Sequence, residues 1–330
     1  MKFARLSILG ASLVIAACGG GGDGELIGAG DNSAGTLEID GSNATAAVRV
    51  SYEAATDAGN LAGLGGGAGF SAGVPGSSAI AVQASDATGR VLDVVSQIPF
   101  GPEVQFCNGV DDTDGTITLS GDIQVPGTFT QGDTFNIAYE MCDQGTGEVV
   151  DGLIELTVGD FTGDLLTGLY MIAMDAVITD LQVTTAADTV TGNGDSTVTL
   201  DTTQSPFVTA GVSGTSLTMD SNANSETLSN YSSSQTFDGN QFPPEYTLGA
   251  SGTLDSTQLT GVVVYATSPD FTGSGENYPH AGVLTVEGNA SMARLVAVDS
   301  TDVRIEIDTN GDGTVDETIN TTWDALVNPD

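Results

Sequence analysis

The sequence predicts a mainly β protein. The expected fold is a large antiparallel meander, in the form of a sandwich or a half-open barrel, preceded by two short helices and a disordered glycine-rich tether. From about residue 100 onward, hydrophobic residues alternate with polar ones at a period of two, which is the pattern of a strand with one buried face. Roughly ten or more such segments follow one another with no helical pattern between them, and Asn-Gly or Asp-Gly turn signals separate them. Strands that follow one another through such short turns pair antiparallel.

The chain divides into four parts by composition. These are a lipoprotein signal peptide (residues 1–17), a flexible tether (18–36), a helical and glycine-rich preface (37–99) and the antiparallel β domain (100–330). With 330 residues, of which 39 % are hydrophobic, the chain holds enough apolar material for one large core.

The first 17 residues have the features of a secretory signal. Lys2 and Arg5 give a positive start, and the apolar run from Leu6 to Ala16 is too short to span a membrane as a helix. Small residues directly before Cys18 resemble the processing site of bacterial lipoproteins. The resemblance implies that the Cys18 thiol receives a diacylglycerol, that the chain is cut before Cys18 and that the new amine is acylated. Several acyl chains on one residue give lasting attachment. The alternative is an ordinary signal peptide followed by a free cysteine.

The glycines after Cys18 predict a flexible tether that ends at about Thr36. In the lipoprotein family, an aspartate directly after the cysteine commonly retains the protein at the inner membrane. Gly19 stands at that position here. The resemblance therefore implies an outer-membrane lipoprotein that faces the periplasm or the cell surface, with the membrane as its partner through the acyl chains on Cys18. A protein or small-molecule partner is left open.

Two helical patterns precede the β region. The first helix is predicted to begin after Ser42 or Asn43, and the second to begin near residue 85 and to end at Pro99. Eight glycines between Gly59 and Gly76 predict that no regular element forms there. The apolar face of the first helix is expected to hold Ala44, Ala47, Val48, Tyr52 and Ala55, and that of the second Val91, Leu92, Val95 and Ile98.

Alternation defines the strands that follow. The expected inward-facing residues are Phe135, Ile137, Tyr139 and Met141 in one strand, Ile154, Leu156 and Val158 in the next, and Tyr170, Ile172, Met174, Ala176 and Ile178 in a third. Further strands are predicted around Ile117, Val198, Leu217, Tyr246, Val263, Leu284, Val296 and Ile305.

The charge of the chain excludes two classes of function. Forty-four acidic and 6 basic side chains give a formal net charge of −38, which would repel nucleic-acid phosphates at nearly every approach. A polybasic membrane-binding surface is excluded as well. The acidity fits a solvated surface, and the alternative interpretation is binding of divalent cations.

Cys107 and Cys142 are the two cysteines that remain besides Cys18. In an oxidising compartment they are expected to form one disulfide, and the alternative is a pair of reduced buried thiols. A catalytic thiol is disfavoured because the only histidine, His280, lies far along the chain in a predicted loop.

The segment from Asp308 to Glu317 matches the first half of a calcium-binding loop. The candidate metal ligands are Asp308, Asn310, Asp312 and Asp316. Ile319 stands where a helix–loop–helix calcium site would place a bidentate glutamate, and strand-like alternation flanks the segment. The sequence therefore favours a plain β-hairpin turn, with weak calcium binding as the alternative and no other cofactor.

No catalytic residues are predicted. Acid pairs such as Asp111–Asp112 and Asp316–Glu317 could serve a hydrolase, but such pairs arise by chance in so acidic a chain. The sequence carries no nucleophile elbow with a usable histidine and no phosphate-binding loop. We therefore expect a protein that is not an enzyme.

Patches that cover roughly half of the mature chain resemble a group of uncharacterised proteobacterial lipoproteins. The resemblance implies an anchored β domain and brings no known activity or functional residues. The patches are Gly261–Val264, Tyr278–Gly288, Val303–Asp308, Gly311–Gly313 and Trp323, together with Cys107, Gly132–Phe135 and Cys142.

Three functions follow as expectations. The first is a non-enzymatic structural, binding or envelope-maintenance role at the outer membrane. The second is a periplasmic carrier that holds an apolar ligand in a concave sheet, and the third is a calcium-dependent surface adhesion module. A large apolar cavity would favour the carrier, whereas a sheet filled by the protein's own side chains would favour the first.

Overall fold

A computed structural model describes residues 35–62, 83, 91, 102–107, 114–125, 128–143, 148–186, 188–221, 223–240, 242–275 and 277–329. These residues belong to one compact unit, Ala34–Asp330. The predicted signal peptide, Cys18, nearly all of the tether and most of the second predicted helix lie outside them. Within the described ranges, none of the helices combines the length and apolar character needed to cross a bilayer.

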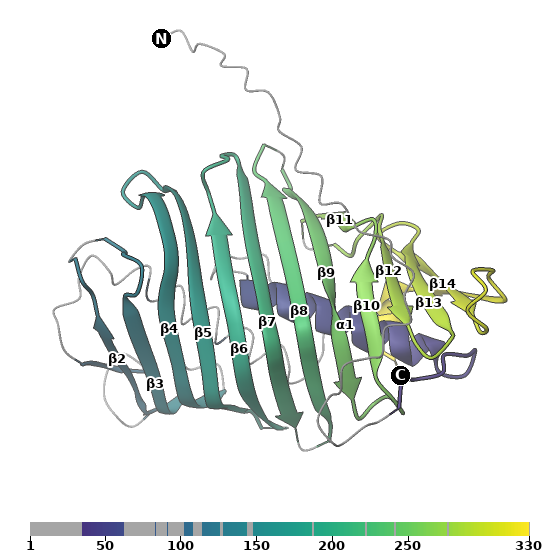
Figure 1. Ribbon diagram of the computed structural model, residues 1–330, viewed down its shortest axis with the longest axis horizontal. Helices are drawn as coiled ribbons and strands as arrows, with labels where there is room; N and C mark the ends of the chain where they lie inside the picture. The colour runs from purple at the N-terminus through teal and green to yellow at the C-terminus, as the bar shows by residue number, and fades with distance from the viewer. Residues whose placement is uncertain are drawn as a thin grey trace, which may run out of the picture. The chain divides into compact units, whose positions relative to one another are not determined.

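The prediction of a mainly β protein with a large antiparallel meander is confirmed (Figure 1). The described strands form one 15-stranded sheet in nearly sequential order, except that β11 pairs with β9 beside β10. The sheet is a single curved layer, with β1 and β15 at its two edges. Its strands are β1 (Glu103–Phe106), β2 (Thr116–Asp122), β3 (Thr134–Asp143), β4 (Val149–Asp164), β5 (Leu169–Thr184), β6 (Thr189–Asp201), β7 (Phe207–Ser221), β8 (Ser225–Asp238), β9 (Glu245–Ser256), β10 (Val263–Thr267), β11 (Phe271–Ser274), β12 (Val283–Glu287), β13 (Met292–Ala297), β14 (Asp302–Asp308) and β15 (Glu317–Thr322).

The predicted alternation is confirmed along the long central strands. On β5, Ile172, Met174, Ala176 and Ile178 are buried, while the residues between them are exposed or half-buried. On β4, the predicted inward residues are likewise buried. Side chains at a period of two therefore build one continuous core on the concave face of the sheet.

The end of β3 departs from the predicted alternation. Met141, expected to face inward, is 65 % exposed, and Cys142 is buried in its place. The reason is a β-bulge, because the pairing with β4 shifts between Tyr139 and Cys142. Met141 takes a φ of 49°, and its backbone N–H donates to Asp151 Oδ2 at 3.4 Å. One extra residue on a strand reverses the faces of all residues beyond it.

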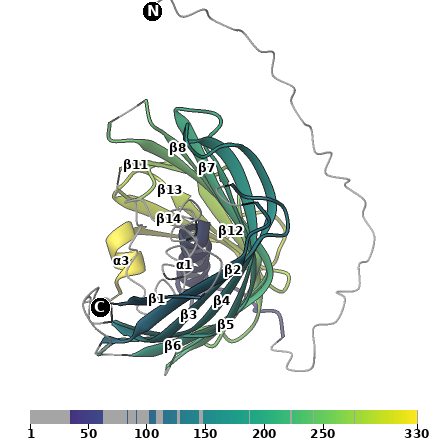
Figure 2. The same cartoon turned by 90° about the vertical axis from the view of Figure 1, so that its left-hand side faces the viewer.

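Further register shifts follow on the neighbouring strands, between β4 and β5, β5 and β6, β6 and β7, and β8 and β9. Asp180 and Asn230 take positive φ angles at these shifts, as Gly152 does at 124°. A Cβ atom at Gly152 would lie 2.5 Å from the carbonyl oxygen of Asp180, so only glycine fits. Bulges bend the strands that carry them, and this line of bulges accompanies the curvature visible in Figure 2.

Helix α1 (Ala44–Ala62) lies in the concavity of the sheet (Figure 2). It contacts strands β6 to β9 and β12 to β14. The predicted apolar face is confirmed, because Ala44, Ala47, Val48, Tyr52 and Ala55 are all buried. The expectation that regular structure stops at Gly59 is wrong, since the helix continues through Gly59 to Ala62. One glycine costs a helix only about 1 kcal/mol, which tertiary contacts can offset.

Further helical residues are described outside α1. Val91, in the second predicted helix, is helical and buried, and so is Gln83. Helix α3 (Trp323–Val327), which the sequence did not predict, follows β15 directly. The Thr322 side chain caps it by accepting a hydrogen bond from the N–H of Ala325.

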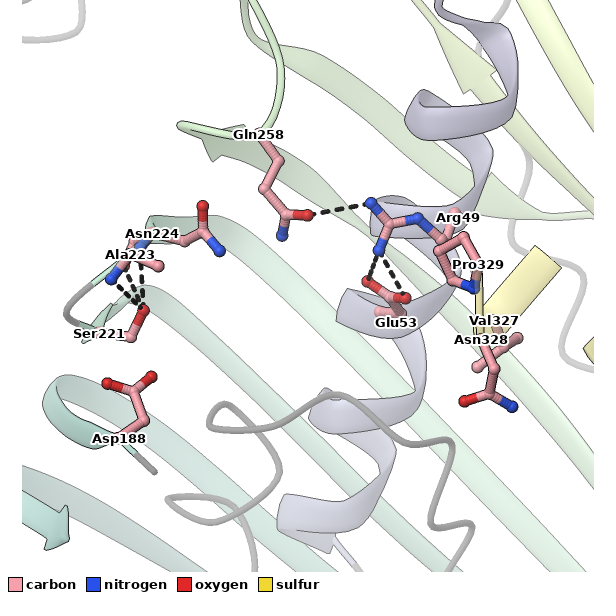
Figure 3. A pocket seen from close by; sticks show the side chains of 10 residues that line it. All are labelled: Arg49, Glu53, Asp188, Ser221, Ala223, Asn224, Gln258, Val327, Asn328 and Pro329. Atoms are coloured by element: carbon pink, nitrogen blue, oxygen red, sulfur yellow. Dashed lines mark hydrogen bonds and ion pairs between the residues drawn. The ribbon is translucent and has the colours of Figure 1, made fainter. Parts of the chain in front are cut away.

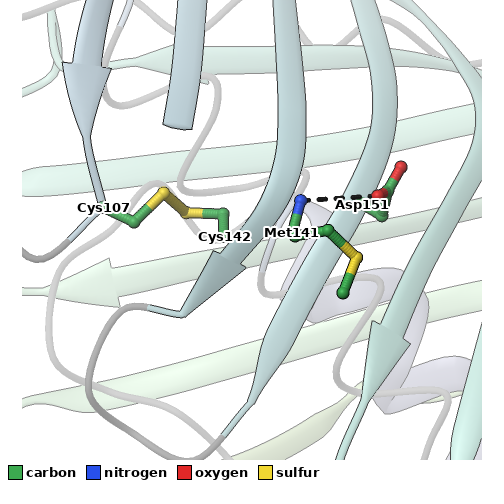
Figure 4. Close-up of a disulfide and its surroundings, with 4 residues drawn as sticks. All are labelled: Cys107, Met141, Cys142 and Asp151. Carbon is green, nitrogen blue, oxygen red and sulfur yellow. Dashed lines mark hydrogen bonds between the residues drawn. A yellow bond between two sulfur atoms is a disulfide. The ribbon is translucent and has the colours of Figure 1, made fainter. Parts of the chain in front are cut away.

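The predicted disulfide is present between Cys107, which follows β1, and Cys142 on β3 (Figure 4). The sulfur atoms are 2.08 Å apart and the Cα atoms 5.4 Å apart. Because β2 separates β1 from β3 in the sheet, the bond crosses one strand of the meander. It ties the first edge strand to the core at the bulge.

We expect no reactive thiol from Cys107 or Cys142 until a reductant is added, because the bonded sulfurs cannot attack a thiol reagent. The measurement is thiol titration of the Cys18→Ser variant in denaturant, with and without reductant. Two thiols found in denaturant without reductant would contradict the bond. The Cys18→Ser/Cys142→Ser variant is the matched control, because its Cys107 must titrate under both conditions.

Candidate functional site

A pocket of about 470 Å³ lies between α1 and the turns at one end of the strands (Figure 3). Its wall comes from α1, from the turns after β5, β7 and β9, and from the chain after α3. Most of the lining residues are polar or charged. They are Arg49, Glu53, Asp188, Ser221, Ala223, Asn224, Gln258, Val327, Asn328 and Pro329.

An ion pair on α1 lines this pocket. Arg49 Nη1 is 3.1 Å from Glu53 Oε1, and the two residues stand one helical turn apart. Arg49 Nη2 donates to Gln258 Oε1 at 3.0 Å. The network continues into the sheet, where Gln258 Nε2 donates to Glu226 Oε1 at 3.0 Å and Ser256 Oγ donates to the same oxygen. Both ends of the guanidinium group are thereby held.

Glu53 is the buried member of this network. Its side chain is 4 % exposed, against 21 % for that of Arg49. Burial raises the pKa of Glu53 to about 7, even though the charge and hydrogen bonds of Arg49 act in the opposite direction. The charge of Glu226 raises this pKa further. Glu53 therefore changes its protonation state near neutral pH, and with it the charge of the pocket.

The surface between α1 and the sheet contains further polar groups. Ser51 on α1 and Ser233 on β8 are buried, and among the described residues their hydroxyl groups make no hydrogen bond. The hydroxyl group of Tyr265 on β10 is likewise buried and without a partner there, and burial raises its pKa. A concave face with these groups is a poor match for an apolar ligand, because such a ligand leaves them unsatisfied.

The predicted acidic hairpin is present between β14 and β15. Asp308 Oδ1 accepts hydrogen bonds from the N–H groups of Asn310 and Gly311, and its Oδ2 accepts from Gly313 at 2.7 Å. Burial raises the pKa of Asp308, but the hydrogen bonds from these backbone groups outweigh it, so that the pKa lies below its usual value.

The other three candidate ligands hold the same turn. Asn310 Oδ1 accepts from the N–H of Asp312, and Asp312 Oδ1 accepts from that of Thr314. Asp316 Oδ2 accepts from the N–H and the hydroxyl group of Thr309. The described residues contain no cluster of three or more acidic, histidine or cysteine side chains able to hold a metal ion. The geometry favours the turn interpretation, and weak calcium binding stays a prediction.

We expect calcium and magnesium at matched ionic strength to raise the melting temperature of the wild type equally, through general screening of the acidic surface. The side-chain oxygens of the hairpin already accept backbone hydrogen bonds, which leaves calcium little advantage over magnesium. The measurement is thermal unfolding of the wild type and of Asp312→Asn. A shift specific to calcium, lost in Asp312→Asn, would establish a calcium site by mass action.

The structure does not bring the other candidates together. His280 is exposed, and its backbone N–H donates to the carbonyl oxygen of Thr272. Asp316 is engaged with Thr309 in the hairpin, while Asp111, Asp112 and Cys18 lie outside the described residues.

Sequence reasoning missed Arg49, Glu53 and Gln258. One signal was available, because Arg49 and Glu53 stand four residues apart, the spacing at which two side chains on a helix can form an ion pair. Gln258 lies 209 residues from Arg49, so its place in the network follows from the fold alone.

The sequence matches no protein-family model, and neither a curated protein nor a solved structure matches it significantly. The resemblance of the last third of the chain to proteobacterial lipoproteins stays an expectation.

Proposed function

We propose that this protein is a lipid-anchored outer-membrane lipoprotein with a non-enzymatic structural or binding role in the cell envelope. The apolar run and the small residues before Cys18 support the anchor. One structural observation supports the role: α1 and the aromatic residues around it occupy the concave face of the sheet. The core is built from the protein's own side chains, as in a scaffold.

The carrier alternative has less support. The pocket beside α1 is lined mainly by polar residues, which include the Arg49–Glu53 ion pair. Apolar ligands are held by sites with predominantly apolar walls. The adhesion alternative depends on calcium binding by the acidic hairpin. The side chains of this hairpin already form hydrogen bonds with one another and with the backbone.

Replacing Cys18 with serine is expected to leave the protein unprocessed or soluble, because serine cannot receive the thioether-linked lipid. The measurement is membrane fractionation with a salt wash, together with intact mass. The matched control is the double variant Cys107→Ser/Cys142→Ser, which removes both other cysteines and should stay in the outer-membrane fraction. A Cys18→Ser variant that still pellets with the outer membrane after the wash would refute the anchor.

A second experiment separates scaffold from carrier. The wild-type protein is purified from membranes in mild detergent, and its bound lipids and small molecules are identified by mass spectrometry. We expect no apolar ligand in stoichiometric amount beyond the covalent acyl chains. A single apolar compound bound at one molecule per chain would favour the carrier instead.

A further inference from the structure

Two large apolar side chains of this protein are almost completely exposed at the tips of hairpins. Leu166, in the turn between β4 and β5, is 96 % exposed, and Phe242, in the turn between β8 and β9, is 100 % exposed. Leu169 and Phe207 lie beside such turns and are 45 % and 41 % exposed. Val125, between β2 and β3, is 48 % exposed. We call these five residues the apolar edge.

The five residues lie at the same end of the strands. In an antiparallel meander, every second turn lies at the same end of the strands. The turns after β2, β4, β6 and β8 are such a set. Figure 1 shows the turns after β4, β6 and β8 along the upper edge. The topology therefore gathers apolar side chains from four separate hairpins on one side of the molecule.

The turns that carry these side chains are held by aspartates. Asp164 Oδ1 accepts a hydrogen bond from the N–H of Leu166 at 2.8 Å. Asp201 Oδ1 accepts from Thr203, and Asp238 Oδ1 from Asn240, each at 2.8 Å. Such side-chain-to-backbone bonds fix the turn conformation. The apolar side chains thus project from ordered turns.

We propose that the apolar edge inserts into the interface of a lipid bilayer with zwitterionic headgroups. Large apolar side chains on separate protruding turns can each enter the headgroup region, where apolar surface is removed from water. The flat surface of a protein partner would contact only the tips of these side chains. The charge selects the lipid, because the four turns contain no lysine or arginine and Asp164, Asp201 and Asp238 lie close behind the tips. An anionic surface would be repelled.

The chain before the described residues is long enough to allow contact between the apolar edge and the bilayer. This argument rests on the proposed anchor at Cys18. Thr36 pairs with Val262, which lies in the turn after β9. This turn is at the end of the strands opposite to the apolar edge. Residues 18–34 can span up to about 60 Å when extended. The 12 residues of β9 cover about 40 Å. An anchored chain can therefore present the apolar edge to the bilayer that holds its acyl chains.

The test uses the single tryptophan of the chain. Trp323 is fully buried, so the wild type supplies the background emission. Phe242→Trp adds a tryptophan at the apolar edge, and Val177→Trp, at a 47 % exposed position in the middle of β5, is the matched control. Each full-length protein is reconstituted with phosphatidylcholine vesicles that contain brominated acyl chains, which quench tryptophan on contact. Flotation measures vesicle binding separately.

We expect at least a twofold loss of the emission added by Phe242→Trp, and no more quenching of Val177→Trp than of the wild type. Equal quenching of both variants in floated vesicles contradicts insertion of the apolar edge and is still consistent with the lipid anchor. A wild type that does not float overturns both. A change in the emission of Phe242→Trp that depends on protein concentration and not on brominated lipid shows contact between two copies of the protein. This result also overturns the proposal.

Discussion

Replacing Trp323 with alanine is expected to lower the free energy of unfolding by about 3–5 kcal/mol, the usual cost of removing a buried tryptophan side chain. Trp323 is fully buried and stacks on Tyr278, with ring centroids 5.5 Å apart at 10°. The ring centroid of Tyr52 on α1 lies 4.9 Å from that of Trp323, and the ring centroid of Phe271 on β11 lies 6.0 Å from it. One side chain therefore joins α1, the sheet and α3.

The Trp323 indole N–H also bonds two carbonyl oxygens, those of Pro279 at 3.0 Å and Asp299 at 3.1 Å. Alanine would leave both oxygens without this donor, which adds to the cost of the cavity. The measurement is urea unfolding followed by far-UV circular dichroism, since the variant has no tryptophan. Trp323→Phe is the control, because it keeps much of the ring packing and loses only the donor. A loss below about 1 kcal/mol in the alanine variant would contradict the central place of this residue.

Replacing Glu53 with glutamine is expected to remove a stability change of about 2–3 kcal/mol between pH 4.5 and pH 7. Burial raises the pKa of Glu53 from 4.5 to about 7, so the folded protein holds this proton more tightly than the unfolded chain. The stabilisation is complete below pH 4.5 and is lost as the pH rises through 7. Glutamine resembles the protonated acid and still accepts a hydrogen bond from Arg49. At pH 8 the variant should therefore be more stable than the wild type.

The measurement is urea unfolding of the wild type and of Glu53→Gln at a series of pH values from 4.5 to 8. The quantity of interest is the difference between the two proteins, because the many other carboxylates titrate alike in both. Glu245→Gln, at an exposed position, is the control for the removal of one surface carboxylate. A difference for Glu53→Gln that does not change with pH would show that folding leaves the pKa of Glu53 unchanged.

The strands could be predicted from the sequence because each needs only its own alternation. Ile172, Met174, Ala176 and Ile178 face the core as expected, since a period of two is a property of the extended backbone itself. The first helix and the Cys107–Cys142 bond could be predicted for similar reasons of pattern and compartment. The acidic hairpin follows from its turn residues.

The reversal at Met141 and Cys142 could not be predicted in this way. The bulge exists because β3 must pair with β4 while the sheet bends, and that demand comes from the neighbouring strands. Nothing in the local alternation indicates which residue is added. The path of α1 through Gly59 has the same origin, because packing against the sheet compensates for a poor helix-forming residue.

The antiparallel meander, the disulfide partners and the turn chemistry follow from the amino-acid sequence, because they depend on residues close together in the chain or on the cysteine count. The single curved layer around α1, and the meeting of Glu53 and Arg49 with Gln258 in a pocket, are features of the folded chain. So is the position of Leu166 and Phe242 at the same end of the strands. Each of these depends on how many strands separate two residues in space and how far the sheet bends between them, and the local sequence pattern records neither quantity.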